Sequence, residues 1–300
     1  MGELFKLGFG NRNRTVKNLL SWSIDRLTEA KIDSPRLDSE ILLAHALACR
    51  REKVFMEPDR KIEIDPWRKY LTLLERRLSR EPIHYIIGMK EFWSLDFKIV
   101  SGVLIPRPET EFLVQLLLEL NPDRLVPFQI LDIGTGSGAL TVAAAKEFPK
   151  SQISSMDICS TSLDITRHNA EAHNVLNRIQ ILEADVFGDI FFQALGTFHF
   201  ILANPPYIAS GDLEKLMPEV RDFEPRHALD GGSDGLHFYR RIIPLSRNKL
   251  KPGGYLIMEI GDGQLSIVSR LIKDYFSDSG FLSDFSGKPR VLFARKEIHG

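Results

Sequence analysis

The tetrapeptide Asn204-Pro205-Pro206-Tyr207 has residue types that suit the binding of a planar NH2 group. It follows the apolar run 198–203, which we expect to form a buried strand. The side-chain oxygen of Asn204 and the carbonyl of Pro205 are two hydrogen-bond acceptors, and the prolines keep the backbone around them rigid. Tyr207 adds a flat face on which an amide or a nucleobase could stack. Asn and Pro are also common turn residues, so a plain turn is the competing interpretation.

A second candidate is the glycine-rich run Gly134-Thr135-Gly136-Ser137-Gly138, which joins a predicted strand to a predicted helix. Glycines let the backbone turn tightly and approach a ligand closely, so we expect a nucleotide-like ligand here. Asp157 ends the next predicted strand, where its carboxylate can accept both hydroxyl hydrogens of a ribose. An N-cap of the following helix is the structural alternative for Asp157. Gly134, Gly136 and Ala139 also fit the looser dinucleotide pattern, so this loop alone leaves an NAD enzyme open.

The candidate residues follow the predicted strands of a parallel sheet. Short apolar runs that alternate with helical stretches occur at 129–133, 152–156, 179–183, 198–203 and 255–259. This alternation predicts an α/β, Rossmann-like sheet covered on both faces. Such sheets bind ligands beyond the carboxyl ends of their strands, so the glycine run, Asp157, Asp185 and Asn204 should converge on one crevice. Residues 281–285 and 291–296 are expected to add an antiparallel pair at the sheet edge.

The N-terminal part of the chain has a different pattern. From Thr15 to about Arg80, apolar residues recur at helical spacing in three stretches that we expect to be amphipathic helices. Pro35 and the Asp65-Pro66 pair mark two helix starts, with Asp65 as an N-cap. Residues 92–100 are rich in strand formers and are predicted to form a β-hairpin with the chain up to Ile105. The predicted domains are therefore a helical domain at 1–88, a hairpin linker at 89–106 and an α/β domain at 107–300.

Composition limits the classes of partner. The chain has 300 residues, 43% of them hydrophobic, which is enough for two ordinary cores. Its 39 Lys and Arg residues balance 40 Asp and Glu residues, so no general cationic field attracts a polyanion. Cys49 and Cys159 form no metal-type spacing and no disulfide framework, so we expect no metal and a reducing, cytoplasmic compartment. Residues 1–6 lack a signal-peptide core and the apolar stretch 113–120 is too short to span a bilayer, so we expect no membrane segment.

Together these motifs resemble a known family, the S-adenosylmethionine-dependent glutamine N5-methyltransferases called HemK or PrmC. The resemblance covers most of the chain. The similar stretches are 81–88 (EPIHYIIG), 104–111 (LIPRPETE), the glycine run, Asn204 to Tyr207, Phe223-Glu224-Pro225, Glu259-Ile260-Gly261, and Asp284 with Gly287 and Arg290. Asn-Pro-Pro-Tyr alone is shared with enzymes that methylate adenine or guanine amines, but the surrounding stretches are more specific.

The resemblance implies a class I methyltransferase domain and a small helical domain that helps to bind class I peptide chain release factors. By motif match, Gly134, Thr135, Gly136, Ser137 and Gly138 would hold the methionine end of S-adenosyl-L-methionine, and Asp157 its ribose. Asp185 and Val186 would lie beside the adenine, where the family often has a large aromatic residue that stacks better than valine. Asn204 would border the cofactor and, with Pro205, Pro206 and Tyr207, hold the glutamine of a Gly-Gly-Gln loop. Asn204, Pro205 and Tyr207 would be catalytic.

The expected chemistry is methyl transfer to a side-chain amide nitrogen. This nitrogen is a poor nucleophile because it shares its lone pair with the carbonyl, a delocalisation whose scale is the rotation barrier of roughly 18–20 kcal/mol. Two neutral hydrogen bonds of about 0.5–1.5 kcal/mol each cannot offset this. Alignment with the sulfonium-bound methyl can contribute about 7–11 kcal/mol, so we expect positioning plus fixed acceptor dipoles. No separate base is assigned, because the protonated amide is acidic enough to lose its proton to water.

Three other functions stay open. A glutamine of a ribosomal protein is the nearest rival substrate, because a related family carries the same tetrapeptide. An exocyclic amine of a nucleobase is the next rival, although the balanced charge disfavours a nucleic-acid substrate. A non-catalytic cofactor-binding assembly factor is the alternative from another class. The intact Asn204-Pro205-Pro206-Tyr207 disfavours it, since a protein that no longer catalyses methyl transfer need not retain these acceptors.

Overall fold

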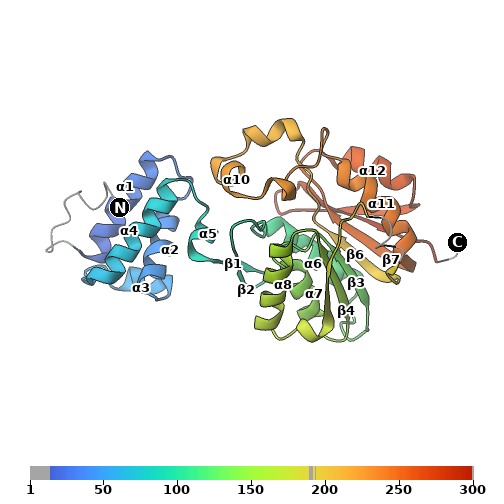
Figure 1. Cartoon of the computed structure of the whole chain (residues 1–300), viewed down its shortest axis with the longest axis horizontal. Helices are drawn as coiled ribbons and strands as arrows, with labels where there is room; N and C mark the ends of the chain where they lie inside the picture. The colour runs from blue at the N-terminus through green and yellow to red at the C-terminus, as the bar shows by residue number, and fades with distance from the viewer. Residues whose placement is uncertain (1–13, 189–191, 193, 299–300) are drawn as a thin grey trace. The chain divides into compact units, whose positions relative to one another are not determined.

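The computed structural model describes residues 14–188, 192 and 194–298 (Figure 1). It divides into two compact units. The helical unit comprises the chain up to Gly88 together with Pro218–Phe223, and the sheet unit comprises Met89–Met217 and the chain from Glu224 onward. Residues 1–6, where the sequence shows no signal-peptide core, lie outside the described part. Within that part, no helix is both long enough and apolar enough to cross a bilayer.

The described part of the helical unit contains the three predicted amphipathic helices and three shorter ones. The predicted ones are α1 (Val16–Glu29), α2 (Pro35–Ala46) and α4 (Ile64–Leu78), and the shorter ones are α3 (Arg51–Met56), α5 (Ile83–Ile87) and α10 (Pro218–Phe223). Helix α2 begins at Pro35, as predicted from its fixed φ. Helix α4 begins one residue before Asp65, with Glu63 as N-cap, so the prediction of Asp65 as N-cap is wrong. Asp65 instead lies in the first turn, where its charge favours the helix dipole.

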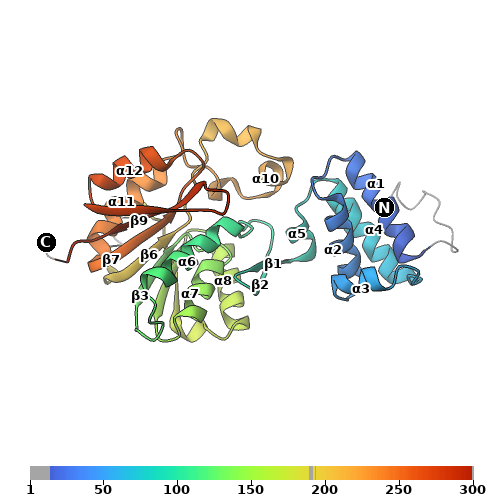
Figure 2. The same ribbon diagram turned by 180° about the vertical axis from the view of Figure 1, so that it is seen from behind.

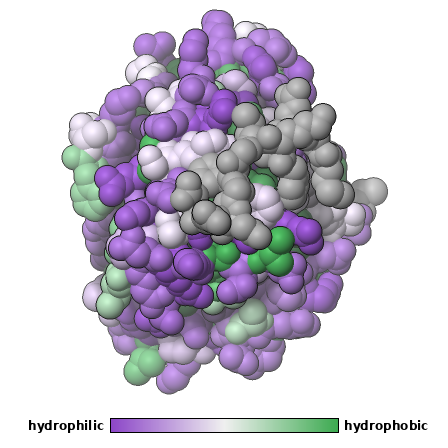
Figure 3. All heavy atoms as spheres, turned by 90° about the vertical axis from the view of Figure 1, so that its left-hand side faces the viewer, coloured by the Kyte–Doolittle hydropathy of each residue, from purple (hydrophilic) through white to green (hydrophobic). Residues whose placement is uncertain are grey.

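The core of the helical unit is mostly apolar and includes a buried charged cluster. Leu19, Leu42 and Leu74, from three different helices, are fully buried together. Buried Arg77 on α4 donates from Nε to Asp38 on α2 at 2.6 Å and from Nη2 to Glu219 on α10 at 3.0 Å. These contacts join Pro218–Phe223, distant in sequence, to the helical unit. The face of this unit seen in Figure 3 is mostly hydrophilic, with scattered hydrophobic side chains.

The larger sheet of the sheet unit has seven described strands. They are β3 (Gln129–Ile133), β4 (Gln152–Asp157), β5 (Ile179–Glu183), β6 (Phe198–Ala203), β7 (Leu250–Glu259), β8 (Asp278–Ser283) and β9 (Pro289–Arg295), in the spatial order β5-β4-β3-β6-β7-β9-β8. The first five strands in that order are parallel, and β9 and β8 are antiparallel to their neighbours. The prediction of a parallel sheet with an antiparallel edge pair is confirmed.

Two groups of helices cover the sheet. Figure 1 and Figure 2 show α6 (Glu111–Leu120), α7 (Ala139–Glu147) and α8 (Ser160–Ala172) on one side, and α11 (His237–Lys249) and α12 (Leu265–Lys273) on the other. The strand residues between them are apolar in both directions, as a sheet buried on both faces requires. In β6, for example, Ile201, Leu202 and Ala203 are all fully buried.

The predicted hairpin exists, but its predicted placement is wrong. Strands β1 (Met89–Phe92) and β2 (Leu95–Lys98) pair around a turn at Trp93-Ser94, inside the stretch expected to be one strand. Both turn residues have positive φ, 53° and 56°, as a tight hairpin turn demands. Two acids stabilise this strained turn: Glu111 accepts the Trp93 backbone N–H and Glu147 accepts its indole N–H, each at 2.7 Å. The hairpin belongs to the sheet unit.

Candidate active site

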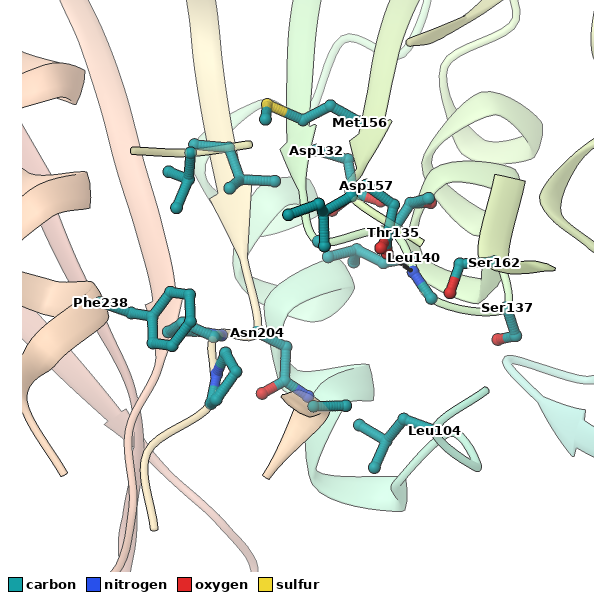
Figure 4. A pocket seen from close by; sticks show the side chains of 18 of the residues that line it. Leu104, Asp132, Thr135, Ser137, Leu140, Met156, Asp157, Ser162, Asn204 and Phe238 are labelled. Carbon is teal, nitrogen blue, oxygen red and sulfur yellow. Dashed lines mark hydrogen bonds between the residues drawn. The ribbon is translucent and has the colours of Figure 1, made fainter. Parts of the chain in front are cut away.

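A cavity of about 360 Å³ lies in the sheet unit, where β3, β4, β5 and β6 end. Figure 4 shows side chains from the ends of β3, β4 and β6 and from α11 around it. The predicted site residues that line the cavity are Gly134, Thr135, Gly136, Ser137, Asp157, Asp185, Val186, Asn204, Pro205 and Pro206. Gly138 and Tyr207, the other two predicted residues, lie outside this lining. The structure therefore brings the two motifs together, as expected at the carboxyl edge of a parallel sheet.

The glycine loop leaves room for a ligand. Gly134 and Gly136 have φ of +77° and +56°, which side-chain-bearing residues rarely adopt, and a Cβ on either would project into open space. Gly138, the N-cap of α7, has φ of +78°, and a Cβ there would meet Thr166 at 3.0 Å. The first two glycines therefore border the cavity with bare backbone, whereas the third allows α7 and α8 to pack. This surface fits the close approach of a cofactor.

Asp157 is held in place by backbone donors from two elements. Its Oδ2 accepts the Gly136 N–H at 2.9 Å and its Oδ1 accepts the Cys159 N–H at 2.9 Å. Cys159, not Asp157, is the N-cap of α8. Each carboxylate oxygen keeps a second lone pair for a ligand donor. The carboxylate at the end of β4 is thus fixed beside the glycine loop, in a geometry that suits a pair of ribose hydroxyls.

Apolar side chains next to the acidic strand ends complete this part of the cavity. Ile158 follows Asp157 and Phe187 follows Val186; both line the cavity, with 60% and 38% of their surface exposed. Phe187 stacks on His237 with ring centroids 4.4 Å apart. Val186 itself is buried. Sequence reasoning assigned Val186 and missed Ile158 and Phe187, although Ile158, an apolar residue directly after the acid that ends β4, carried an available signal.

Asn204 belongs to a hydrogen-bond chain that starts on β7. Its Nδ2 donates to Thr110 Oγ1 at 3.0 Å, and Thr110 Oγ1 donates to Glu259 Oε2 at 2.6 Å. Strands β6 and β7 are parallel, with Ala203 opposite Met258, so the next residues, Asn204 and Glu259, end neighbouring strands. Thr110 closes η2 (Pro108–Thr110), directly before α6. Sequence reasoning assigned neither Thr110 nor Glu259.

Glu259 lies in a site that disfavours its charged form. It is 1% exposed, and burial raises its pKa to about 7 against the hydrogen bonds from Thr110 and Tyr207, which lower it. Tyr207 Oη donates to Glu259 Oε1 at 3.2 Å. Burial is also the main cause that raises the pKa of Tyr207. Tyr207 is therefore a neutral donor to Glu259.

A second buried acid, Asp132, lies under the glycine loop. It accepts Thr141 Oγ1 at 2.6 Å, lines the cavity and is 1% exposed. Burial raises its pKa to about 6. Asp132 ties the loop to the start of α7, since Thr141 also contacts Thr135 at 3.2 Å. Sequence reasoning gave Asp132 no role.

An ion pair supports the loop before η2. Arg107, which lines the cavity, donates to Glu224 Oε1 at 2.6 Å, and Glu224 Oε2 accepts the Ile105 N–H at 3.4 Å. Glu224 is buried, and burial raises its pKa despite Arg107. It directly follows Pro218–Phe223, which belongs to the helical unit. Within the described part of the chain, no group of three or more His, Cys, Asp or Glu residues could hold a metal ion.

Comparison with known proteins places this geometry in a family. Residues 18–88 match the PrmC N-terminal domain and residues 108–219 match the methyltransferase small domain. The chain is 39% identical over 274 residues to the release factor glutamine methyltransferase of Geobacter sulfurreducens, which covers 91% of this chain and 92% of that protein. It is 36% identical over 282 residues to that of Koribacter versatilis, which covers 94% of this chain and 99% of the relative.

A solved structure supports the fold. The Thermus thermophilus 16S rRNA methyltransferase RsmC, in complex with AdoMet and guanosine, aligns with a TM-score of 0.52 at 21% identity, over 70% of this chain and 50% of that one. This likeness shows the class I methyltransferase fold alone. The alignments with the sequence relatives extend over both units, so they identify the family more specifically than the fold does. The chain belongs to the release factor glutamine methyltransferase family.

Proposed function

We propose that this protein transfers a methyl group from S-adenosyl-L-methionine to the side-chain amide nitrogen of the glutamine in the Gly-Gly-Gln loop of class I peptide chain release factors. The observation that carries the proposal is that Asn204-Pro205-Pro206 and the glycine loop with Asp157 line one cavity. A methyl donor and an amide acceptor must meet within such a space. Family membership supports the choice of substrate.

The cofactor side of the cavity has groups suited to each part of S-adenosylmethionine, which when bound supplies a methyl group activated by positive sulfur. The bare backbone at Gly134 and Gly136 can face its amino-acid end. Asp157 can accept both ribose hydroxyl hydrogens through its remaining lone pairs. Ile158 and Phe187 offer apolar surface for the adenine beside Asp185 and Val186.

The substrate side orients the amide. The Asn204 side-chain oxygen and the Pro205 carbonyl accept the two N–H hydrogens of the glutamine amide, so that its nitrogen faces the methyl carbon. When the N–C bond forms and the C–S bond breaks, the nitrogen gains positive charge. Both acceptors then bind its hydrogens more strongly, which favours the transition state over the ground state. The nitrogen finally loses one proton to water.

The helical unit is proposed to bind the release factor. Its match to the PrmC N-terminal domain, separate from the match of residues 108–219 to the methyltransferase small domain, supports a task other than methyl transfer. The site of action is then the cytoplasm, where release factors meet ribosomes.

A labelling experiment tests the function. The purified protein is incubated with methyl-labelled S-adenosylmethionine and a purified class I release factor, and the Gly-Gly-Gln peptide is analysed by mass spectrometry. We expect one methyl group on the glutamine side chain. A release factor in which this glutamine is replaced by alanine is the matched control and should stay unlabelled. Label on ribosomal protein or nucleic acid, with none on the release factor, would overturn the proposal.

A further inference from the structure

Thr110 stands between two groups whose hydrogen-bonding characters differ. On one side its hydroxyl contacts the Glu259 carboxyl at 2.6 Å, and on the other it contacts the Asn204 amide at 3.0 Å. Thr110 and Glu259 are 7% and 1% exposed, so water competes little for either contact. No motif of the proposed reaction assigns a role to this threonine.

The direction of each hydrogen bond follows from the chemistry of the three groups. An ionised carboxylate only accepts, so the single hydroxyl hydrogen of Thr110 must point to Glu259. The Thr110 oxygen then offers only lone pairs to Asn204. The NH2 end of the Asn204 amide must therefore face Thr110, which turns Oδ1 to the opposite side. Asn204 is labelled among the side chains around the pocket in Figure 4.

We propose that Thr110 is a positioning residue that, with Glu259 as its acceptor, holds the Asn204 amide with its oxygen toward the substrate nitrogen. This inference rests on the proposed function, in which Asn204 accepts a hydrogen of the glutamine amide. In the reverse orientation the NH2 of Asn204 would oppose the NH2 of the substrate. Its oxygen would also oppose the Thr110 oxygen, so both contacts would be lost.

Glu259 supports both ends of the tetrapeptide. Its Oε2 accepts from Thr110, which holds Asn204, and its Oε1 accepts from Tyr207 at 3.2 Å. Tyr239 donates to the backbone carbonyl of Glu259 at 3.1 Å and fixes the end of β7. One carboxylate thus fixes Tyr207 directly and Asn204 through Thr110. These two contacts hold the segment around Pro205, so that the Asn204 oxygen and the Pro205 carbonyl keep a constant direction.

The test compares three Thr110 variants with the wild type in single-turnover methylation of the release factor. Thr110→Val keeps the shape but leaves the Asn204 NH2 without its acceptor, and we expect the rate to fall by about 10- to 100-fold. Thr110→Ala repeats the test without the added methyl. Thr110→Ser keeps the hydroxyl and should stay within about threefold of the wild type. Cofactor affinity, measured by calorimetry, should be unchanged in all three.

A double-mutant cycle shows whether Thr110 acts through Asn204. In an Asn204→Ala background, Thr110→Val should lower the rate by less than about twofold, because the group that it orients is gone. A full additional loss would assign Thr110 a different role and overturn the inference. So would a wild-type rate in Thr110→Val, or a Thr110→Ser variant as slow as Thr110→Val. Absence of label on the release factor with the wild-type protein would instead overturn the proposed function, and this inference with it.

Discussion

One cluster of buried acidic side chains in each unit shows a different kind of hydrogen-bond donor. In the helical unit, Asp38 and Glu219 both accept hydrogen bonds from the guanidinium of Arg77. In the sheet unit, Glu259 accepts from the hydroxyls of Thr110 and Tyr207. All of these carboxylates are nearly inaccessible to water. Around these acids, Arg77 of the helical unit therefore supplies a cation, whereas the end of β7 in the sheet unit supplies neutral donors.

This difference separates buried charge that holds helices together from buried charge that orients neighbouring side chains. A guanidinium offsets the charge of a carboxylate and leaves a network that holds helices together. Hydroxyl donors cannot offset the charge, and the pKa of Glu259 accordingly rises to about 7. A carboxylate kept in such a site costs stability, but it dictates the direction of every hydrogen bond around it. We therefore expect damage to the Arg77 cluster to affect stability, and damage around Glu259 to affect turnover.

The largest effect is expected for Arg77→Met. The substitution keeps an unbranched apolar stem but removes the cation of buried Asp38, whereas Glu219 keeps its ion pair with Arg80. Removing one partner of a buried pair costs roughly 3–5 kcal/mol, so we expect the free energy of unfolding of the helical unit to fall by about that amount. Chemical denaturation followed by circular dichroism measures the change.

Arg60→Met is the matched control for this substitution. Arg60 pairs with Glu57, and their side chains are 42% and 45% exposed. An exposed pair contributes at most about 1 kcal/mol, so this variant should unfold close to the wild type. Equal losses in the two variants would mean that burial of the Arg77 cluster has no special energetic role, and the contrast between the units would disappear.

Next in size is the effect of Asn204→Ala on turnover. Deleting one of two acceptors that bind more strongly in the transition state should lower the methylation rate by roughly 100-fold or more. Asn204 is half-buried at a strand end, so the free energy of unfolding should change far less than in Arg77→Met. Single-turnover labelling and denaturation of the same preparation measure both quantities. A variant that methylates at the wild-type rate would remove Asn204 from the mechanism.

A smaller and different effect is expected for Asp157→Ala. This carboxylate is proposed to bind the ribose, so its loss should weaken the affinity for S-adenosylmethionine by roughly 10- to 100-fold. Asp164→Ala, on the exposed side of α8, is the control and should bind normally. Isothermal titration calorimetry gives the dissociation constants. Wild-type affinity in Asp157→Ala would show that the ribose assignment is wrong.

The sequence predicted the site residues that lie at the end of a single predicted strand. Asp157 and Asn204 could be placed because parallel strands put their carboxyl ends at one edge, and that edge is where the cavity lies. Glu259 also ends a predicted strand, and an acid in that position was a usable signal. The parallel register, with Ala203 opposite Met258, is what makes Glu259 a neighbour of Asn204.

Other features depend on packing that no local pattern contains. Thr110 reaches Glu259 across 149 residues of sequence, so their contact exists only in the folded sheet unit. The turn at Trp93-Ser94 lacks the Asn-Gly or Asp-Gly pair that is typical of such turns. Instead, Glu111 and Glu147, on helices distant in sequence, stabilise it through hydrogen bonds with Trp93. The attachment of Pro218–Phe223 to the helical unit likewise rests on Arg77, far earlier in the chain.

The finest test of the contrast is the pH response of Glu259→Gln. Burial raises the pKa of Glu259 from 4.5 to about 7, with a further increase from Glu109 and opposing effects of Thr110, Tyr207 and Arg107. The folded state therefore holds its proton more tightly than the unfolded state. The contribution of protonated Glu259 to the free energy of unfolding is complete below about pH 4.5 and is lost as the pH rises through about 7. Turnover should rise over the same interval, because only the ionised carboxylate forces the Thr110 hydroxyl to donate.

Stability and activity of the wild type should thus change in opposite directions between pH 4.5 and about 7. In Glu259→Gln the side-chain oxygen can still accept from Thr110 but no longer titrates. We therefore expect only a severalfold loss of turnover above pH 7 and a flatter pH dependence of both quantities. Asp132, with a pKa of about 6, titrates in both proteins, so a slope near pH 6 should be common to them. If the variant kept the wild-type limb near pH 7, that limb would belong to another group, and the hydroxyl-bonded acid would have no positional role.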